Sequence, residues 1–69
     1  MLKIFGTRLK ELRTERRLTQ AQISAELGIH SVTYLHYEKN QREPSLELLV
    51  TIAKYYDVST DYLLGLSDI

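Results

Sequence analysis

Two histidines are the first candidates for chemistry in this 69-residue chain, and metal binding is the chemistry they suggest. His30 and His36 are six positions apart, which on one helix places them about 120° apart around its axis. They therefore cannot hold one ion from a single helix face. Cysteine is absent, which removes thiolate ligands, disulfides and a thiol nucleophile. We expect no metal site and no cofactor.

Catalytic motifs are also missing. Serine, histidine and aspartate occur, but no spacing brings them together as a nucleophile with its base. The glycines Gly6, Gly28 and Gly65 are isolated, so the sequence has no glycine-rich loop of the kind that cradles a phosphate. So short a chain leaves little room for a substrate cavity. We predict that the protein is not an enzyme, and we identify no small-molecule ligand.

Helical elements must position the remaining polar groups. Apolar residues recur at helical spacing, as in Phe5, Leu9 and Leu12, and no stretch alternates long enough for a strand. The expected helices cover about residues 3–16, 19–27, 31–38, 45–56 and 59–64. The prediction is an all-α fold of five short helices in a single domain, residues 1–69.

Capping residues predict where these helices begin and end. Thr19 and Gln22 have the spacing of a capping box, in which each side chain binds the other residue's backbone N–H. Ser45 and Ser59 are suited to begin the last two helices. Gly28 ends the second helix early, because glycine adopts a left-handed conformation at little cost. Gly65 is expected to end the fifth.

Charge and hydropathy restrict the environment. The net charge is zero, but residues 1–20 hold six basic and two acidic residues, whereas the rest holds three basic and seven acidic ones. This asymmetry permits a basic face or an ordinary solvated helix surface. Charges interrupt the apolar residues near the N-terminus, and nothing later approaches a membrane span. We expect a cytoplasmic protein with no membrane partner.

The stretch 19–38 reads as two short helices joined by a glycine turn. Apolar side chains on both sides of the turn are suited to hold the helices together: Ile23, Leu27, Ile29, Tyr34 and Tyr37. Ser24 is small enough to let them cross closely. The outer face of the second helix would then be free to enter a DNA major groove. This outer face consists of Ser31, Val32, Thr33, Leu35 and His36.

Four segments resemble one known family. They are FGTRLKELRTERRLTQ, ISAELGI, YE followed by a polar loop and REPS, and DVSTDYLLG. In this order and spacing, the chain from about residue 5 to 65 resembles the Cro/repressor-type (xenobiotic-response-element-like) helix-turn-helix family of bacterial and phage regulators. The resemblance implies a lambda-repressor-like fold, with the helix-turn-helix formed by helices 2 and 3. It also implies a sequence-specific regulator of transcription, a repressor, that binds double-stranded DNA.

The resemblance also implies roles for individual residues. Gln20 matches a position that bonds a DNA phosphate, as suits a helix N-terminus. Base edges are read in relatives from the positions of Ser31, Val32 and His36. The DNA backbone is approached from the positions of Thr33, Lys39 and Arg42. A salt bridge in relatives corresponds to Arg13 and Glu38.

Several residues depart from the family pattern. His30 stands where serine or threonine usually caps the third helix, so the cap is expected at His30 or at Ser31. Tyr34 brings a hydroxyl that needs a partner or an exit to solvent. Asn40 and Asp57 replace frequent glycines and tolerate left-handed geometry better than most residues. His36 replaces a frequent arginine or lysine, and Ser24 replaces the more common alanine.

Two points stay open in the sequence. Leu35 is either a buried filler or an apolar contact for DNA or protein. The surplus of apolar residues near the C-terminus packs in the core or forms a homodimer interface in the last two helices: Tyr55, Tyr56, Tyr62, Leu63, Leu64 and Leu66. The rival to DNA binding is a protein-interaction or antitoxin-type module on the same fold.

Overall fold

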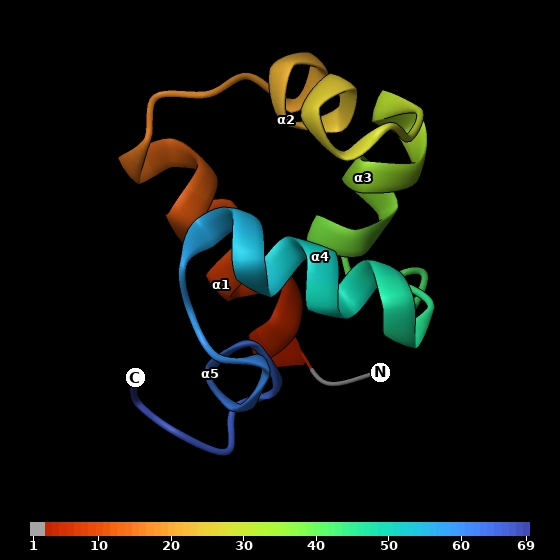
Figure 1. The fold of residues 1–69 in the computed structure, drawn as a ribbon. Coiled ribbons are helices and arrows are strands. Elements are labelled where there is room, and N and C mark those ends of the chain that lie inside the picture. Colours follow the sequence, from red (N-terminus) through yellow and green to blue (C-terminus); the bar gives the residue numbers. More distant parts are fainter. Residues whose placement is uncertain (1–2) are drawn as a thin grey trace.

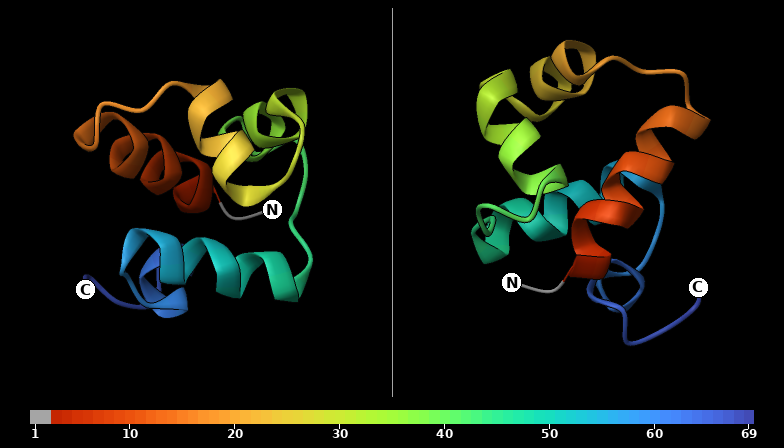
Figure 2. Two further views of the ribbon diagram at one scale, coloured as in Figure 1. Left: turned by 45° about the horizontal axis from the view of Figure 1, so that its top comes forward. Right: turned by 180° about the vertical axis from the view of Figure 1, so that it is seen from behind.

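The computed structural model describes residues 3–69, and within this range the chain is helical with no strand. Its elements are α1 (Lys3–Glu15), α2 (Gln20–Leu27), α3 (Ser31–Glu38), α4 (Leu46–Tyr56) and α5 (Thr60–Leu64). The predicted all-α architecture of five short helices is confirmed. α2 and α3 form one end of the molecule, α5 and the C-terminal segment lie at the other, and α1 and α4 lie between them (Figures 1 and 2).

Side-chain caps begin three of the helices as predicted. The hydroxyl of Thr19 accepts the N–H of Gln22 at 3.0 Å, and the Gln22 amide oxygen accepts the N–H of Thr19 at 2.8 Å. Ser45 and Ser59 cap α4 and α5 through their hydroxyls. At α3 the capping position is occupied by His30, whose side chain makes no capping bond. A shift of the cap to Ser31 is therefore wrong, because Ser31 is already the first helical residue.

The same hydrogen-bonded motif ends each helix. After α3, the N–H of Gln41 donates to the His36 carbonyl at 2.9 Å, and the N–H of Asn40 donates to the Tyr37 carbonyl at 3.1 Å. This is a Schellman motif, which places one residue in the left-handed conformation. The left-handed residues after α1 to α5 are, in order, Arg17, Gly28, Asn40, Asp57 and Gly65. Sequence reasoning anticipated all of these except Arg17.

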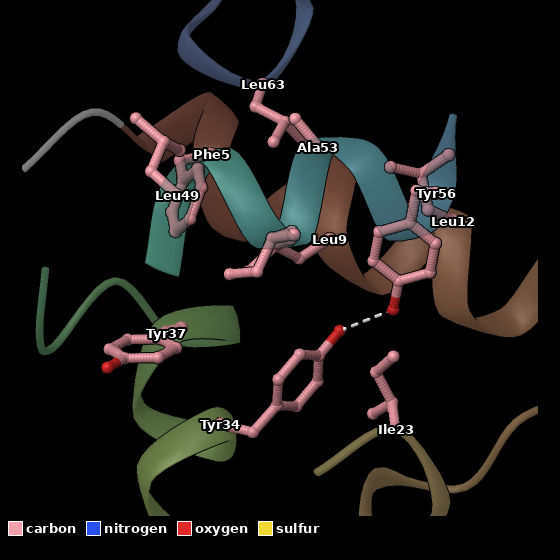
Figure 3. Packing of buried hydrophobic residues seen from close by; sticks show 11 residues of the cluster. Phe5, Leu9, Leu12, Ile23, Tyr34, Tyr37, Leu49, Ala53, Tyr56 and Leu63 are labelled. Atoms are coloured by element: carbon pink, nitrogen blue, oxygen red, sulfur yellow. Dashed lines mark hydrogen bonds between the residues drawn. The ribbon is translucent and has the colours of Figure 1, made fainter. Parts of the chain in front are cut away.

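Each helix contributes to one apolar core (Figure 3). Its buried members are Phe5, Leu9, Leu12, Ile23, Tyr34, Tyr37, Leu49, Ile52, Ala53, Tyr56 and Leu63. Tyr56 and Leu63 are fully buried in the core, so these two candidates for the dimer interface cannot contribute to it. Tyr55 remains partly exposed, and Leu66 is 75% exposed.

Two of the buried residues share a hydrogen bond in the core. The hydroxyls of Tyr34 and Tyr56 lie 3.0 Å apart and join α3 to α4 (Figure 3). Tyr56 is thus the partner that the Tyr34 hydroxyl required. Burial is the main cause that raises the pKa of both Tyr34 and Tyr56 above the ordinary phenol value.

Arginines of the basic N-terminal third hold helices together. Arg8 donates to the carbonyls of Tyr62 and Ser67, and its guanidinium lies 4.0 Å from the centre of the Tyr62 ring. Arg16 donates to the Tyr56 carbonyl at 2.7 Å and lies over the ring of that tyrosine. Part of the charge asymmetry therefore serves packing between α1 and the C-terminal helices.

Candidate nucleic-acid interface

The close crossing of α2 and α3 rests on small and apolar side chains. Ile23 is fully buried and Ser24 is 2% exposed. The Ser24 hydroxyl donates to the Gln20 carbonyl at 2.5 Å, so this polar group is satisfied within its own helix. Leu27 and Ile29, on either side of the Gly28 turn, are partly buried and pack against the core. The apolar residues around the turn that the pattern of residues 19–38 predicted to hold the two helices together are thus buried or partly buried.

The two sides of α3 differ sharply in burial. Tyr34 and Tyr37 are 0% and 5% exposed and fix the inner side of the helix. On the outer face, Ser31 and Val32 are exposed, and Val32 is 61% exposed. The flanking residues Thr33, Leu35 and His36 are half-buried. Leu35 therefore lies at the margin of the exposed surface, and Val32 is its main apolar group.

A buried ion pair fixes the last turn of α3 to α1. Arg13 Nε lies 2.6 Å from Glu38 Oε2, and Arg13 Nη2 lies 3.2 Å from Glu38 Oε1. The side chains are only 13% and 4% exposed. The hydrogen bond with Glu38 is the largest cause that raises the pKa of Arg13. This is the pair that the family resemblance implied, and its two-pronged geometry restrains both distance and orientation.

Gln20 joins the same network, which sequence reasoning did not foresee. Its amide nitrogen Nε2 donates to Glu38 Oε1 at 3.2 Å. Glu38 therefore connects the start of α2 and the body of α1 to the end of α3. The bond uses one of the two N–H groups of the Gln20 amide. No local pattern reveals this contact, because 18 positions separate the two residues.

The N-termini of α2 and α3 and the cations that follow α3 favour the binding of anions. The first turns of α2 and α3 contain no acidic residue, so the partial positive charge of each helix N-terminus is not neutralised locally. Lys39 and Arg42 follow α3 and are both exposed. Within residues 3–69, no group of three histidine or acidic side chains is placed to hold a metal ion. Over the same range, no helix combines the length and apolar character needed to cross a membrane.

The chain matches the protein-family model described as Helix-turn-helix over residues 9–63. It is 44% identical over 94% of its length to the Bacillus subtilis (strain 168) protein named "Uncharacterized HTH-type transcriptional regulator YobD", and it covers 58% of that relative. It is 38% identical over 93% of its length to the transcriptional regulator ImmR of the same strain. It is 38% identical over 80% of its length to the cryptic phage CTXphi transcriptional repressor RstR of Vibrio cholerae. The chain covers 50% of each of these last two, so it spans about half the length of the relatives it matches.

Proposed function

Because the chain belongs to the helix-turn-helix family, we propose that it is a transcriptional regulator that binds a specific double-stranded DNA sequence and acts as a repressor. The observation that carries this proposal is the asymmetry of α3, which buries Tyr34 and Tyr37 while leaving Ser31 and Val32 in solvent. A helix held so firmly on one side is a rigid element that fits a major groove. The relatives' names, two regulators and one repressor, support the same function.

In this proposal, the outer face of α3 reads the base edges. Val32 is the natural contact for a thymine methyl group, because it is apolar and largely exposed. Ser31 donates to or accepts from a base edge, and His36 does so one helical turn after Val32. Leu35 adds an apolar contact at the margin of the groove.

In this proposal, residues at the start of α2 and in and after α3 bind the phosphates. The second N–H of the Gln20 amide and the N-terminus of α2 face one phosphate, since the first is already directed to Glu38. Thr33, Lys39 and Arg42 contact the sugar-phosphate backbone. Such contacts set the register of the protein on the duplex without selecting its sequence.

A homodimer through the C-terminal part of the chain is also part of the proposal. Several large apolar side chains of this part are exposed: Leu46, Val50, Tyr55, Leu66 and Ile69. A second copy that covers some of them removes apolar surface from water. Two-fold symmetry then places two α3 helices about 34 Å apart, on half-sites separated by one turn of DNA.

A second candidate function is a protein-interaction or antitoxin-type module on the same fold. One observation favours it: α3 itself carries neither lysine nor arginine, and the most exposed large side chain on its outer face is the apolar Val32. An outer face with an exposed apolar residue and no lysine or arginine suits a protein partner as well as a groove.

Selection of binding sites from a random duplex pool, with titration of the winners at two salt concentrations, tests the proposal. We expect an enriched inverted repeat whose affinity falls steeply with salt. Arg42→Ala should weaken binding to all sequences by a similar factor. Lys54→Ala, which removes an exposed cation from α4, is the matched control and should bind as the wild type does. Absence of binding at low salt would favour the protein-interaction module.

A further inference from the structure

Asn40 occupies a special place between the two exposed cations that follow α3. It is the left-handed residue of the Schellman motif, with a φ of 58°, and stands directly after Lys39 and two positions before Arg42. A glycine would adopt this conformation more cheaply. We therefore expect the asparagine side chain to have a role beyond ending the helix.

Both ends of the Asn40 amide bind the start of α1. Its Oδ1 accepts the N–H of Gly6 at 3.0 Å, and its Nδ2 donates to the carbonyl of Lys3 at 3.0 Å. These partners are 34 and 37 positions away in sequence. One side chain thus joins the segment after α3 to the first turn of α1, where backbone N–H groups commonly find acceptors outside the helix.

Gly6 makes this contact possible because it has no side chain. A Cβ at this position would lie 2.3 Å from the Glu38 carbonyl oxygen and 2.7 Å from Asn40 Nδ2. The first turn of α1 therefore lies directly against the end of α3. Together with the Arg13–Glu38 ion pair, the Asn40 bonds give the end of α3 two separate attachments to α1.

We propose that Asn40 is a positioning residue for phosphate binding by Lys39 and Arg42. Its two bonds hold the backbone of the segment 39–42 in place before DNA arrives. Less conformational entropy is then lost when the two cations meet phosphates, and a pre-ordered loop binds more tightly for that reason. This inference rests on the proposed DNA-binding function.

Asn40→Gly against Asp57→Gly is the decisive comparison. Both residues are left-handed and end a helix with the same motif, so both substitutions ease the backbone equally. The Asn40 side chain bonds to α1, whereas no side-chain hydrogen bond is found for Asp57 within residues 3–69. The two variants therefore differ in the side-chain attachment and in the carboxylate that Asp57→Gly removes, and Asp57→Asn, which removes that charge while keeping a side chain of the same size, controls for the second difference.

We expect Asn40→Gly to weaken binding of the selected duplex and of an unrelated duplex by the same factor, about three- to tenfold. The slope of log affinity against log salt should shrink by up to about one phosphate contact. Asp57→Gly should leave affinity and slope unchanged. Thermal melting of both variants establishes that each remains folded at the titration temperature, so a change in salt slope does not report unfolding.

Amide hydrogen exchange in the DNA-free protein gives a second readout. Asn40→Gly should speed exchange of the amides at 39–43 and of Gly6, while Asp57→Gly should not. If Asn40→Gly kept the wild-type affinity and salt slope while Arg42→Ala weakened binding, the positioning role would be overturned and DNA binding would stand. If the wild-type chain bound no duplex, both the positioning role of Asn40 and the proposed DNA binding would be contradicted.

Discussion

The pairs α2–α3 and α4–α5 are both short helices joined by a tight turn, yet they present different groups to solvent. No acidic residue lies in the first turn of α2 or α3, whereas Glu47 and Asp61 lie in those of α4 and α5. Carboxylates neutralise a helix N-terminus, so the first pair remains attractive to phosphate and the second does not. In this chain, the same local architecture therefore has helix N-termini without nearby carboxylates in one pair and with them in the other.

The two pairs are also attached to α1 in different ways. The α2–α3 pair is held by the buried ion pair of Arg13 and Glu38, which Gln20 joins. The C-terminal end is held by Arg8, whose ion pair with the fully exposed Asp68 spans 3.9 Å. Charge–charge contacts that water reaches contribute little, whereas buried ones cannot be broken cheaply.

The largest expected effect comes from breaking the buried attachment. Glu38→Gln keeps the side-chain shape but leaves the buried Arg13 without its counter-charge, so the free energy of unfolding should fall by about 3 kcal/mol. Asp68→Asn at the other attachment should change it by no measurable amount. Urea denaturation of both variants tests this contrast. Equal losses from the two substitutions would show that burial does not separate the two ion pairs.

The next effect concerns the hydroxyl pair that joins the two regions. Tyr34→Phe leaves the buried Tyr56 hydroxyl without a partner and should cost about 2 kcal/mol of stability. Combining it with Tyr56→Phe removes both polar groups and should restore part of the loss. Tyr55→Phe, at the exposed neighbour, should change stability by less than about 0.5 kcal/mol. A double variant that lost as much as two single variants together would argue against the pairing.

A smaller effect separates two exposed apolar residues, Val32 on α3 and Leu46 on α4. Val32→Ser on α3 should change the preferred base at one position, with discrimination altered by about tenfold, because it removes a methyl contact. Leu46→Ser on α4, where the side chain is 81% exposed, should leave base preference unchanged and weaken self-association. Binding-site selection and sedimentation equilibrium measure the two outcomes. An altered base preference in the Leu46 variant would place that residue at the DNA instead.

The smallest effect is a dependence of stability on alkaline pH. Burial raises the pKa of Tyr34 and Tyr56, so above pH 10 the unfolded chain ionises at these positions while the native chain keeps its protons. The stabilisation is complete below about pH 10 and is lost as pH rises. The loss should amount to about 1 kcal/mol for Tyr34 between pH 10 and 11. The Tyr34→Phe/Tyr56→Phe variant should reduce this dependence, as unfolding measured across that range will show.

Local features of the chain were predictable because their physics is local. The capping box of Thr19 and Gln22 spans four residues, and its hydrogen bonds form wherever those residues begin a helix. Gly28, Asn40 and Asp57 tolerate left-handed geometry, which fixed three helix ends in advance. Arg17 has no such preference and ends α1 all the same, because the packing of Leu18 and the next helix decides where the chain turns.

Amino-acid types and spacing alone thus determined the number of helices, most of their ends and the two exposed residues of the outer face of α3, Ser31 and Val32. Tertiary structure decided which side chains meet: Gln20 with Glu38, Tyr34 with Tyr56, and Asn40 with Gly6, which are 18, 22 and 34 positions apart. It also decided that Arg8 and Arg16 hold helices together. The physical reason is that a long-range hydrogen bond depends on how whole helices pack, and packing is a property of the complete core.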